Sequence, residues 1–547
     1  MYFEPVHYDA PSAAELASAA CDVAIVGAGP AGLTLALALA QCEIPSVVIE
    51  QRDAVGVGSR ALGLTRRTLD IWEQLGVGEG VRSIGRTWYG GRSFFREQLI
   101  LAHELPHDPT LKHAPMTNLQ QCIAEQLLVD AAIASPYVTL AWQHRFTGIT
   151  QNDEGVTLEL EAPDGARRIV ARYAVACDGA RSPVRTALGL HMDGTSHGSV
   201  YVICDIKLAS TRRLERYAWF DARSNPGSTV LMHGQPHGIW RIDYQLPEDA
   251  SLEAALELAN VAAFVQRHLE TIGETGDWEI VWISSYRAHS LTMRDYRHGR
   301  VLFAGDAAHL LPIFGIRGLN SGVEDSWNLA WKLARVLSGE SSDALLDTYS
   351  AERLPAAREN LAEATRAARF MSPPTRGYRR MRDAVLSLAL NEPAVRDIIN
   401  PRQGSLIALT DSPLSSVNEQ PPGDGAPSPG EIMPNLRITT PGACADVFLY
   451  DQLRYEAALI AVLPAEQRTA FDDAVRELRR ETQIGAVVLD PGSVGMRPGF
   501  GPGSVYLVRP DHHIAARFNS LHGADVHAAV TRALTVSQDR TFAGVPT

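Results

Sequence analysis

The hydrophobic pattern near the N-terminus predicts a strand, a helix and a second strand in close succession. Residues 22–27, "DVAIVG", form a short β-branched apolar run that is typical of a buried parallel strand. The segment "GAGPAGLTLALALAQCEI" follows, with spaced glycines and an Ala- and Leu-rich helix, and "SVVIE" forms a second apolar strand that ends in Glu50. This order predicts a parallel α/β unit.

Two later apolar strands also end in an aspartate. "RRIVARYAVACDG" leads into Asp178 and Gly179, and "VLFAG" leads into Asp306. After a loop rich in Pro and Gly, an apolar stripe at helical spacing predicts a helix that starts near Gly318 to Asn320 and has Gly339 as its C-cap. The stripe consists of Val323, Trp327, Ala330, Ala334 and Leu337.

The remaining pattern predicts further strands and a separate C-terminal domain. "LMHGQPHGIWRIDYQL" alternates enough to predict a strand, and the Pro, Ser and Gly residues of 401–427 indicate a linker. Beyond the linker, "GAVVLD" and "SVYLVRPDHHIAARF" predict strands, and "EQRTAFDDAVRELRR" and "DVHAAVTRAL" predict helices.

Composition narrows the class of protein. A chain of 547 residues with 45% hydrophobic and 21% charged residues is typical of a globular protein of two to four domains. The net charge of −13 argues against a nucleic-acid partner. We expect a cytoplasmic protein without a membrane segment, because no secretory signal is evident and no apolar run reaches the roughly 20 residues that span a bilayer. Six scattered cysteines without a CxxC motif suggest neither a metal site nor a disulfide framework.

The glycine spacing of the first unit suits a dinucleotide. Gly27 permits a tight turn, Gly29 lets the backbone approach a pyrophosphate, and Gly32 allows close packing of helix on strand. The helix N-terminus offers free amides to the phosphates, and Glu50 lies where a ribose hydroxyl would be. FAD and NAD share this adenosine ribose, so the spacing leaves both cofactors open.

Three ordered motifs carry a resemblance to a known family. "GAGPAG" at 27–32, "DGARSPVR" at 178–185 and "GDAAH" to "GLN" at 305–320 are similar in order and spacing to the single-component FAD-dependent aromatic hydroxylases. This family of flavoprotein monooxygenases includes p-hydroxybenzoate hydroxylase and phenol hydroxylase. The resemblance spans about residues 20–370.

The resemblance implies an α/β architecture of three parts. These are a Rossmann-like FAD-binding domain, an inserted mixed-sheet substrate domain, and a C-terminal thioredoxin-like domain without redox cysteines, which we assign to packing or dimerisation. The implied bounds are 1–190 with 285–400 for the FAD domain, 191–284 with additions from about 80–115 for the substrate domain, 401–427 for the linker and 428–547 for the C-terminal domain.

The resemblance also implies roles for individual residues. The expected FAD contacts are Gly27, Gly29, Ala31, Gly32, Glu50, Gln51, Arg60, Gln121, Asp178, Gly179, Asp306, Gly318, Leu319 and Asn320. Asp306 would bind the ribityl chain, and the amides of Leu319 and Asn320 would face the pyrimidine edge of the flavin. Candidate catalytic residues are Arg317, His289 and His233, and candidate substrate contacts are Ile313, Phe314, Trp240 and Arg287.

The implied activity is hydroxylation of a phenolic ring by dioxygen in aromatic catabolism. In the family, NADH or NADPH reduces FAD as a transient reductant, and a flavin C4a-hydroperoxide transfers one oxygen atom to the ring. A cation at Arg317 would lie where the reduced flavin is negative; a solvated surface position, or a pair with Glu324 or Asp325, is the alternative. The chain departs from many relatives at Ile313 and Arg317, where we therefore expect the substrate preference.

Two other functions fit the same motifs. One is a related oxygenation, either hydroxylation with loss of a nitro or halogen substituent or oxygenation of a polyketide. The other, from a different class, is a non-oxygenating flavoprotein, either a dehydrogenase or a flavin carrier that binds a partner protein.

Overall fold

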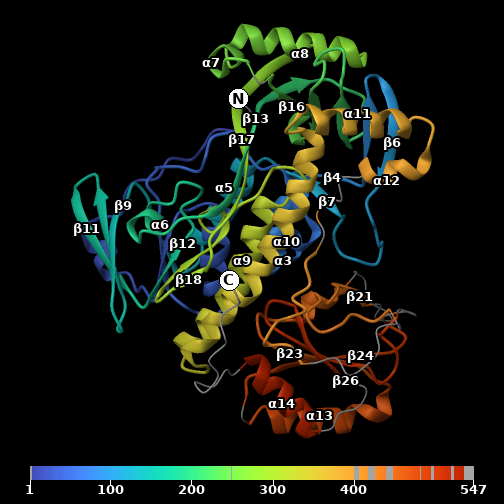
Figure 1. Cartoon of the computed structure of the whole chain (residues 1–547). Coiled ribbons are helices and arrows are strands. Elements are labelled where there is room, and N and C mark those ends of the chain that lie inside the picture. The colour runs from blue at the N-terminus through green and yellow to red at the C-terminus, as the bar shows by residue number, and fades with distance from the viewer. Residues whose placement is uncertain are drawn as a thin grey trace.

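A computed structural model gives the fold in residues 3–58, 60–247, 249–399, 404, 406–416, 425–438, 447–480, 482–493, 498–518 and 523–534. Figure 1 shows a central body crossed by the long helices α9 and α10, an upper sheet covered by α8, and a lower C-terminal domain. Part of the predicted linker, 401–427, lies outside the described residues.

The central body is built on a six-stranded sheet in the order β18-β19-β12-β1-β2-β8. Strand β1 (Val23–Val26) pairs in parallel with β2 (Ser46–Ile49) and β12 (Tyr173–Ala176). Strand β12 pairs in parallel with β19 (Val301–Phe303), while β8 (Val138–Ala141) and the antiparallel β18 (Arg297–His298) form the edges. The predicted parallel α/β unit is confirmed.

Helices cover the apolar strands of this sheet. Helix α2 (Pro30–Ala40) packs against both α9 (Gly318–Leu337) and α5 (Gln121–Ile133). All residues of β1, β2, β12 and β19 are buried, as β-branched runs covered on both faces should be. The helix predicted to start near Gly318 is confirmed, and Gly339 follows it with a left-handed φ of 77°.

The upper body is an eight-stranded, largely antiparallel sheet in the order β20-β17-β13-β16-β15-β14-β5-β6. Its outer face packs on α8 (Leu258–Ile272), and its inner face is covered in part by α10 (Asp347–Met371). The strands are β20 (His309–Leu310), β17 (Trp278–Thr292), β13 (Asp193–Leu208), β16 (Ile239–Gln245), β15 (Thr229–Gly234), β14 (Arg216–Phe220), β5 (Gly90–Phe95) and β6 (Gln98–Glu104).

The strand predicted over 231–246 is instead a hairpin. Strands β15 and β16 pair antiparallel and are joined by a turn at Pro236–Gly238, in which His237 and Gly238 have φ angles of 63° and 69°. Proline cannot donate to a sheet ladder and a left-handed pair of residues reverses the chain, so the run cannot continue as one strand.

Smaller elements connect these bodies. Two three-stranded sheets have the orders β11-β10-β9 and β3-β7-β4. Their strands are β9 (Arg145–Gln151), β10 (Val156–Ala162), β11 (Gly165–Ala171), β3 (Gly63–Thr65), β4 (Arg86–Trp88) and β7 (Met116–Asn118). The remaining helices before the C-terminal domain are α1 (Ala13–Ser18), α3 (Arg66–Gln74), α4 (Gly78–Ile84), α6 (Pro183–Ala187), α7 (Leu252–Ala255), α11 (Arg376–Ala389) and α12 (Arg396–Ile399).

The C-terminal domain contains a four-stranded sheet in the order β24-β23-β25-β26. Its first pairing is parallel and the other two are antiparallel. Its elements are β23 (Ala458–Val462), β24 (Gly485–Leu489), β25 (Val505–Val508), β26 (Ile514–Phe518), α13 (Arg468–Leu478) and α14 (Gly523–Leu534), with β21 (Arg437–Ile438) and β22 (Val447–Phe448) beside them. The thioredoxin-like assignment stays a prediction, as do the domain bounds.

A buried ionic network joins this domain to the central helices. Arg509 forms ion pairs of 2.5 Å with both Glu352 of α10 and Asp511. Lys332 of α9 lies 2.6 Å from Glu352, and Asn328 donates to Asp511 at 2.7 Å. Because these charges are almost fully buried, each one needs the others as compensation.

We expect Arg509→Leu to lower the free energy of unfolding by about 3–5 kcal/mol, because Glu352 and Asp511 would stay buried without their main cation. Urea denaturation of the FAD-loaded protein measures this effect. Arg145→Leu, which breaks an exposed pair with Glu161, is the control and should unfold like the wild type. Equal midpoints for the two variants would contradict the role given to the network.

Candidate cofactor and substrate site

The predicted cofactor residues follow the carboxyl ends of four neighbouring parallel strands. Gly27 follows β1, Glu50 follows β2, and Asp178 stands two positions after β12. Asp306 stands three positions after the end of β19. Carboxyl ends of parallel strands meet at one edge of a sheet, where ligands of open α/β sheets bind. The structure therefore brings these four residues to the same edge.

The glycines of the first turn have different physical roles. A Cβ on Gly27 would lie 2.5 Å from the carbonyl oxygen of Cys177, and one on Gly32 would lie 2.0 Å from that of Gly27. Both positions therefore require glycine for close packing. A Cβ on Gly29, the N-cap of α2, would meet nothing within 4 Å, so this turn leaves an open space at a helix N-terminus. That space fits a pyrophosphate.

Ala31 lies where α2, α9 and the Asp306 turn meet. A Cβ on Gly305 would approach the Ala31 Cβ to 3.1 Å, and one on Gly322 would approach the Gly305 Cα to 3.1 Å. Three small residues thus hold two helices and the turn in one tight contact. Larger side chains here would move Asp306 away from the glycine turn.

Glu50 is buried beside the glycine turn. Its carboxylate accepts a hydrogen bond from the Ala28 amide at 3.1 Å and from Arg52 Nε at 2.9 Å. Arg52 was not among the residues predicted from sequence, because an exposed arginine after a strand carries no local signal. Gln51 is exposed. A ribose at Glu50 would share the carboxylate with Arg52.

Asp306 lies close enough to Arg60 for the two charges to interact. Asp306 has an exposed surface, but protein atoms surround its carboxyl group. The resulting loss of hydration raises the pKa of this carboxyl group. The charges of His309 and Arg60 act in the opposite direction and lower that pKa. Burial likewise raises the pKa of Asp178, although its Oδ2 accepts a hydrogen bond from the Val184 amide at 3.0 Å.

Gln121 holds the segment that carries Arg60. Its Oε1 accepts a hydrogen bond from the Ala61 amide at 2.9 Å, and its Nε2 donates to Glu125 at 2.7 Å. Glu125 in turn accepts from the Gly56 amide at 3.0 Å. Glu125 was also not predicted from the sequence, because a glutamate within a helix carries no local signal of a structural role.

The Asp306 turn is fixed from behind by Asp325 of α9. Asp325 accepts hydrogen bonds from the Gly305 amide at 3.1 Å and from Arg353 Nε at 2.8 Å, and His309 Nε2 lies 2.7 Å from it. Despite burial, the charges of His309 and Arg353 lower the pKa of Asp325 to about 2. The carboxylate therefore stays ionised and keeps the turn in place.

The N-terminus of α9 presents amides without a side-chain cap in the part of the chain that the structure describes. The Asn320 side chain is used elsewhere: its Oδ1 accepts from Thr68 Oγ1 at 2.6 Å and from the Thr65 amide at 3.0 Å. It thus ties α9 to β3 and α3. The first-turn amides of Gly318, Leu319 and Asn320 remain available to an anion.

Arg317 is buried rather than solvated. Its Nη1 donates to Asn360 Oδ1 of α10 at 2.5 Å, and burial lowers its pKa. The alternative of a surface arginine is therefore wrong. The described ion pairs of Glu324 and Asp325 are formed with Arg353. Arg317 lies directly before the first turn of α9.

The loop before Arg317 packs on the inner face of the eight-stranded sheet. Phe314 is buried and meets Tyr201 edge-on, with ring centroids 5.6 Å apart. Ile313 is 38% exposed. The structure therefore places Phe314 against the sheet and leaves Ile313 reachable.

Three of the residues predicted for catalysis or substrate binding lie on the face of this sheet that points away from Phe314. Trp240 is part of the core beneath α8. Arg287 and His289 alternate with Tyr286 and Ala288 on β17, so they point away from the inner face; Arg287 is exposed, and His289 is bonded to Ser196 at 2.9 Å. Side-chain direction depends on strand register, which the local sequence does not reveal.

His233 does lie on the inner face, opposite Arg216 and Arg241 in the strand register. Burial and these two cations hold the pKa of its imidazole well below 6.5. His233 is therefore neutral at physiological pH.

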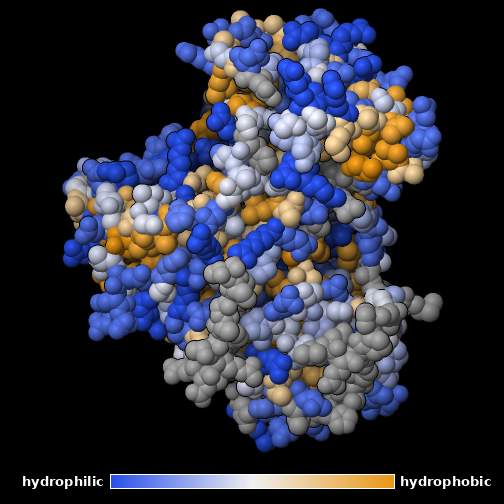
Figure 2. Space-filling view, viewed as in Figure 1, coloured by the Kyte–Doolittle hydropathy of each residue, from blue (hydrophilic) through white to orange (hydrophobic). Residues whose placement is uncertain are grey.

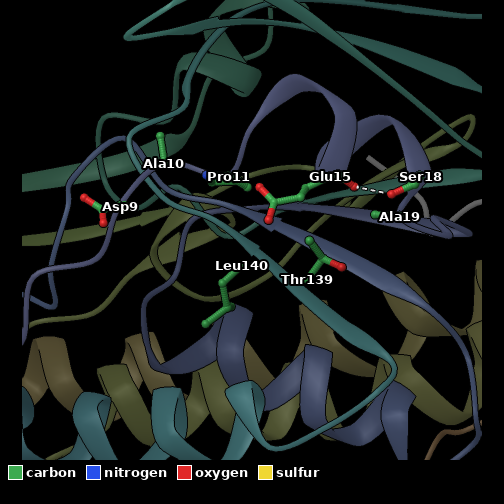
Figure 3. Close-up of a pocket in the computed structure, with 8 residues that line it drawn as sticks. All are labelled: Asp9, Ala10, Pro11, Glu15, Ser18, Ala19, Thr139 and Leu140. Atoms are coloured by element: carbon green, nitrogen blue, oxygen red, sulfur yellow. Dashed lines mark hydrogen bonds between the residues drawn. The ribbon is translucent and has the colours of Figure 1, made fainter.

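A separate hollow of about 560 Å³ lies at another edge of the central body. It is lined by Asp9, Ala10, Pro11, Glu15, Ser18, Ala19, Thr139 and Leu140 (Figure 3). Thr139 and Leu140 belong to the edge strand β8, and the other residues come from the N-terminal segment. None of these eight is a predicted cofactor residue, so we do not assign the hollow to the cofactor.

The arrangement of glycine turn, acidic strand ends and uncapped helix agrees with a family of known proteins. Residues 20–364 match the family described as FAD binding domain. The chain belongs to the FAD-binding domain family. FAD is accordingly its cofactor, and the resemblance found from the three motifs is confirmed.

Several relatives of this chain are named as hydroxylases. A 3-(3-hydroxy-phenyl)propionate/3-hydroxycinnamic acid hydroxylase of Mycolicibacterium smegmatis is 31% identical over 385 residues, which are 69% of this chain and 66% of that protein. OxyS anhydrotetracycline hydroxylase from Streptomyces rimosus is 26% identical, with a TM-score of 0.70, over 94% of this chain and 99% of that one. The flavin-dependent monooxygenase PieE, whose structure holds FAD and substrate, has a TM-score of 0.75 at 24% identity over 94% and 99% of the chains, which supports the fold alone.

We expect Gly29→Ala to leave the protein folded but to weaken FAD binding by more than about tenfold, because the added methyl group would stand in the space of the pyrophosphate. Fluorescence titration of the apoprotein with FAD measures the dissociation constant.

Gly198→Ala, whose Cβ would also meet nothing within 4 Å, is the matched control. Unchanged FAD affinity of Gly29→Ala would show that the pyrophosphate lies elsewhere.

Proposed function

We propose that this protein is an NAD(P)H-dependent FAD monooxygenase that hydroxylates a phenolic ring. The observation that carries this proposal is the loop at 312–317, which joins the cofactor edge of the central body to the inner face of the eight-stranded sheet through Phe314. The hydroxylase names of the relatives support it.

The residues at the cofactor edge would bind and orient FAD. The open turn at Gly29 would hold the pyrophosphate, Glu50 the adenosine ribose and Asp306 the ribityl chain. When bound, FAD supplies hydride acceptance from NADH or NADPH and the activation of dioxygen. The α9 amides and Arg317 would stabilise the negative charge that forms at the pyrimidine edge.

The inner face of the sheet would hold the phenol and exclude water. Phe314, Ala218, Phe220 and Leu231 form an apolar cluster there, together with the stacked rings of Tyr201 and Tyr286. A site enclosed in this way would exclude water, which would otherwise react with intermediates of the reaction. Neutral His233, on the same face, can accept a hydrogen bond from a phenol hydroxyl.

Oxygenation of a larger polyketide-type ring system is the second candidate. It is favoured by the match to the anhydrotetracycline hydroxylase over nearly the whole of both chains. The non-oxygenating flavoprotein has no such support.

We also propose a cytosolic location and a homodimer. We place the protein in the cytosol, in keeping with five free cysteines among the described residues. No helix of the described residues is long and apolar enough to cross a membrane. Exposed apolar side chains gather over β6, α11 and α12, at Leu99, Met381, Leu388 and Ile398, and they favour a homodimer (Figure 2).

Stimulated NAD(P)H oxidation by a panel of phenols tests the activity. Dioxygen uptake matched one to one with a hydroxylated product, carrying label from ¹⁸O₂, is the expected result. Peroxide as the sole product with every phenol would favour the non-oxygenating flavoprotein, and turnover of polycyclic phenols alone would favour the second candidate.

We expect Arg317→Ala to keep FAD bound but to slow flavin reduction by about 10- to 100-fold, because one buried cation near the developing charge would be lost. Stopped-flow absorbance of the flavin under anaerobic conditions gives the rate.

Arg335→Ala, in the last turn of the same helix, should reduce as the wild type does. Arg317→Lys should recover part of the rate. Equal rates of flavin reduction for Arg317→Ala and the wild type would show that Arg317 does not act on the flavin.

A further inference from the structure

A segment at the N-terminus lies against the loops that carry Glu50. Residues 3–12, which we call the N-terminal strap, form neither a helix nor a strand. They precede the part of the chain, 20–364, that matches the family, so the match carries no expectation for them. The strap is nevertheless attached to the central body, because Phe3 and Tyr8 pack against its core.

Two loops position Glu50, and they are bound to each other. The first follows β2 and the second follows β8. The Glu50 amide donates to the Ala141 carbonyl at 3.0 Å, and the His144 amide donates to the Glu50 carbonyl at 2.9 Å. The Gln143 amide donates to the Arg52 carbonyl at 2.9 Å. The direction of the Glu50 carboxylate therefore depends on both loops.

The strap binds to both loops through Tyr8. The Tyr8 amide donates to the Asp53 carbonyl at 2.7 Å in the first loop, and Gln143 Nε2 of the second loop donates to the Tyr8 carbonyl at 2.9 Å. The Tyr8 ring stacks on Trp142, with centroids 4.8 Å apart and planes 10° apart. Gln126 of α5 donates to the Tyr8 hydroxyl at 2.7 Å. The main-chain groups, the ring and the hydroxyl of Tyr8 are thus all engaged.

The second loop needs support of this kind at Gln143. This residue has a φ of 60°, a left-handed conformation that residues other than glycine rarely adopt. Such a conformation persists only where the surrounding contacts hold it. Two of the contacts here are the amide bond to Arg52 and the side-chain bond to Tyr8. The strap therefore helps to keep the second loop in the shape that supports Glu50.

The strap stands away from the sheet directly after Tyr8. The hollow described above lies there, with residues 9–11 on the side of the strap and Thr139 and Leu140 on the side of β8 (Figure 3). This part of the strap does not fill the space beside the edge strand. The attachment to the loops is therefore concentrated at Tyr8.

We propose that Tyr8 is a positioning residue for FAD, which holds the two loops around Glu50 and so retains the adenosine end of the cofactor. This proposal rests on the proposed contact between Glu50 and the adenosine ribose. A carboxylate that is already held in one direction loses less entropy when it binds a ribose hydroxyl than a mobile one does. The role assigned to Tyr8 requires no contact between Tyr8 and FAD.

Fluorescence titration of the apoprotein with FAD tests the role of Tyr8. In Tyr8→Ala we expect the dissociation constant to rise about tenfold, because the ring that anchors the strap is lost. Tyr8→Phe keeps the ring and should stay within about threefold of the wild type. Val6→Ala changes a side chain of the strap that is 50% exposed, and it should bind FAD as the wild type does. Unchanged affinity of Tyr8→Ala would overturn the proposal.

A second variant separates FAD retention from general stability. Glycine suits a φ of 60°, so the apoprotein of Gln143→Gly should melt no lower than the wild type. The variant loses the bond to the Tyr8 carbonyl, and its dissociation constant for FAD should therefore rise about threefold. A lower melting temperature with unchanged FAD affinity would give this contact a structural role only and would contradict the proposal.

A double-mutant cycle with Glu50 completes the test. If Tyr8 acts through Glu50, Tyr8→Ala should change the dissociation constant for FAD by less than about twofold in a Glu50→Gln background. Fold-changes that simply multiply would show that Tyr8 does not act through Glu50. Normal FAD affinity of Glu50→Gln alone would refute the proposed ribose contact, and the role of Tyr8 with it. Weakened binding by Glu50→Gln with an unaffected Tyr8→Ala would refute the role of Tyr8 alone.

Discussion

The cofactor site depends on one close contact, in which small residues let two helices and two strand ends approach each other. Gly27 and Gly32 bring α2 against β1 and β12, and Ala31 meets Gly305 and Gly322 where α9 crosses α2. Side chains at these points would separate the elements. Because the contact is tight, both helix N-termini are held near the acidic strand ends, and free amides and carboxylates face one space.

Charge compensation fixes the elements that this contact brings together. Asp325 holds the Asp306 turn and is itself kept ionised by His309 and Arg353. Further along α9 and α10, Lys332 and Glu352 connect to Arg509 of the C-terminal domain. The same two helices thus hold the cofactor turn at one end and contact the C-terminal domain at the other. The C-terminal domain therefore stabilises the helices that form the site, although none of its described residues is among the predicted cofactor or substrate residues.

The sequence predicted the central body well because its signals are local. A β-branched run, spaced glycines and an acidic strand end all lie within 30 residues of each other, and they located Gly27 and Glu50. An apolar stripe at helical spacing located α9. The substrate sheet was harder, because its faces depend on pairing between distant strands. Trp240 was assigned to the substrate although it packs under α8, and Arg216 was missed because an isolated arginine in an alternating strand resembles any solvent-facing position.

The buried position of Arg317 changes where substrate preference should be sought. Its guanidinium is turned toward Asn360 of α10, and Phe314 is fixed against the sheet, so we propose that the loop acts mainly on the edge of the flavin. A loop held in this way would stabilise negative charge on the cofactor, but it offers few side chains that could distinguish one phenol from another. The sheet opposite it carries the buried Arg216, and polar atoms of Asp243 and Tyr286 that have no hydrogen-bond partner among the described residues. Discrimination between substrates relies on buried polar groups that a wrong ligand would leave unsatisfied, and this chain concentrates them on the sheet rather than in the loop.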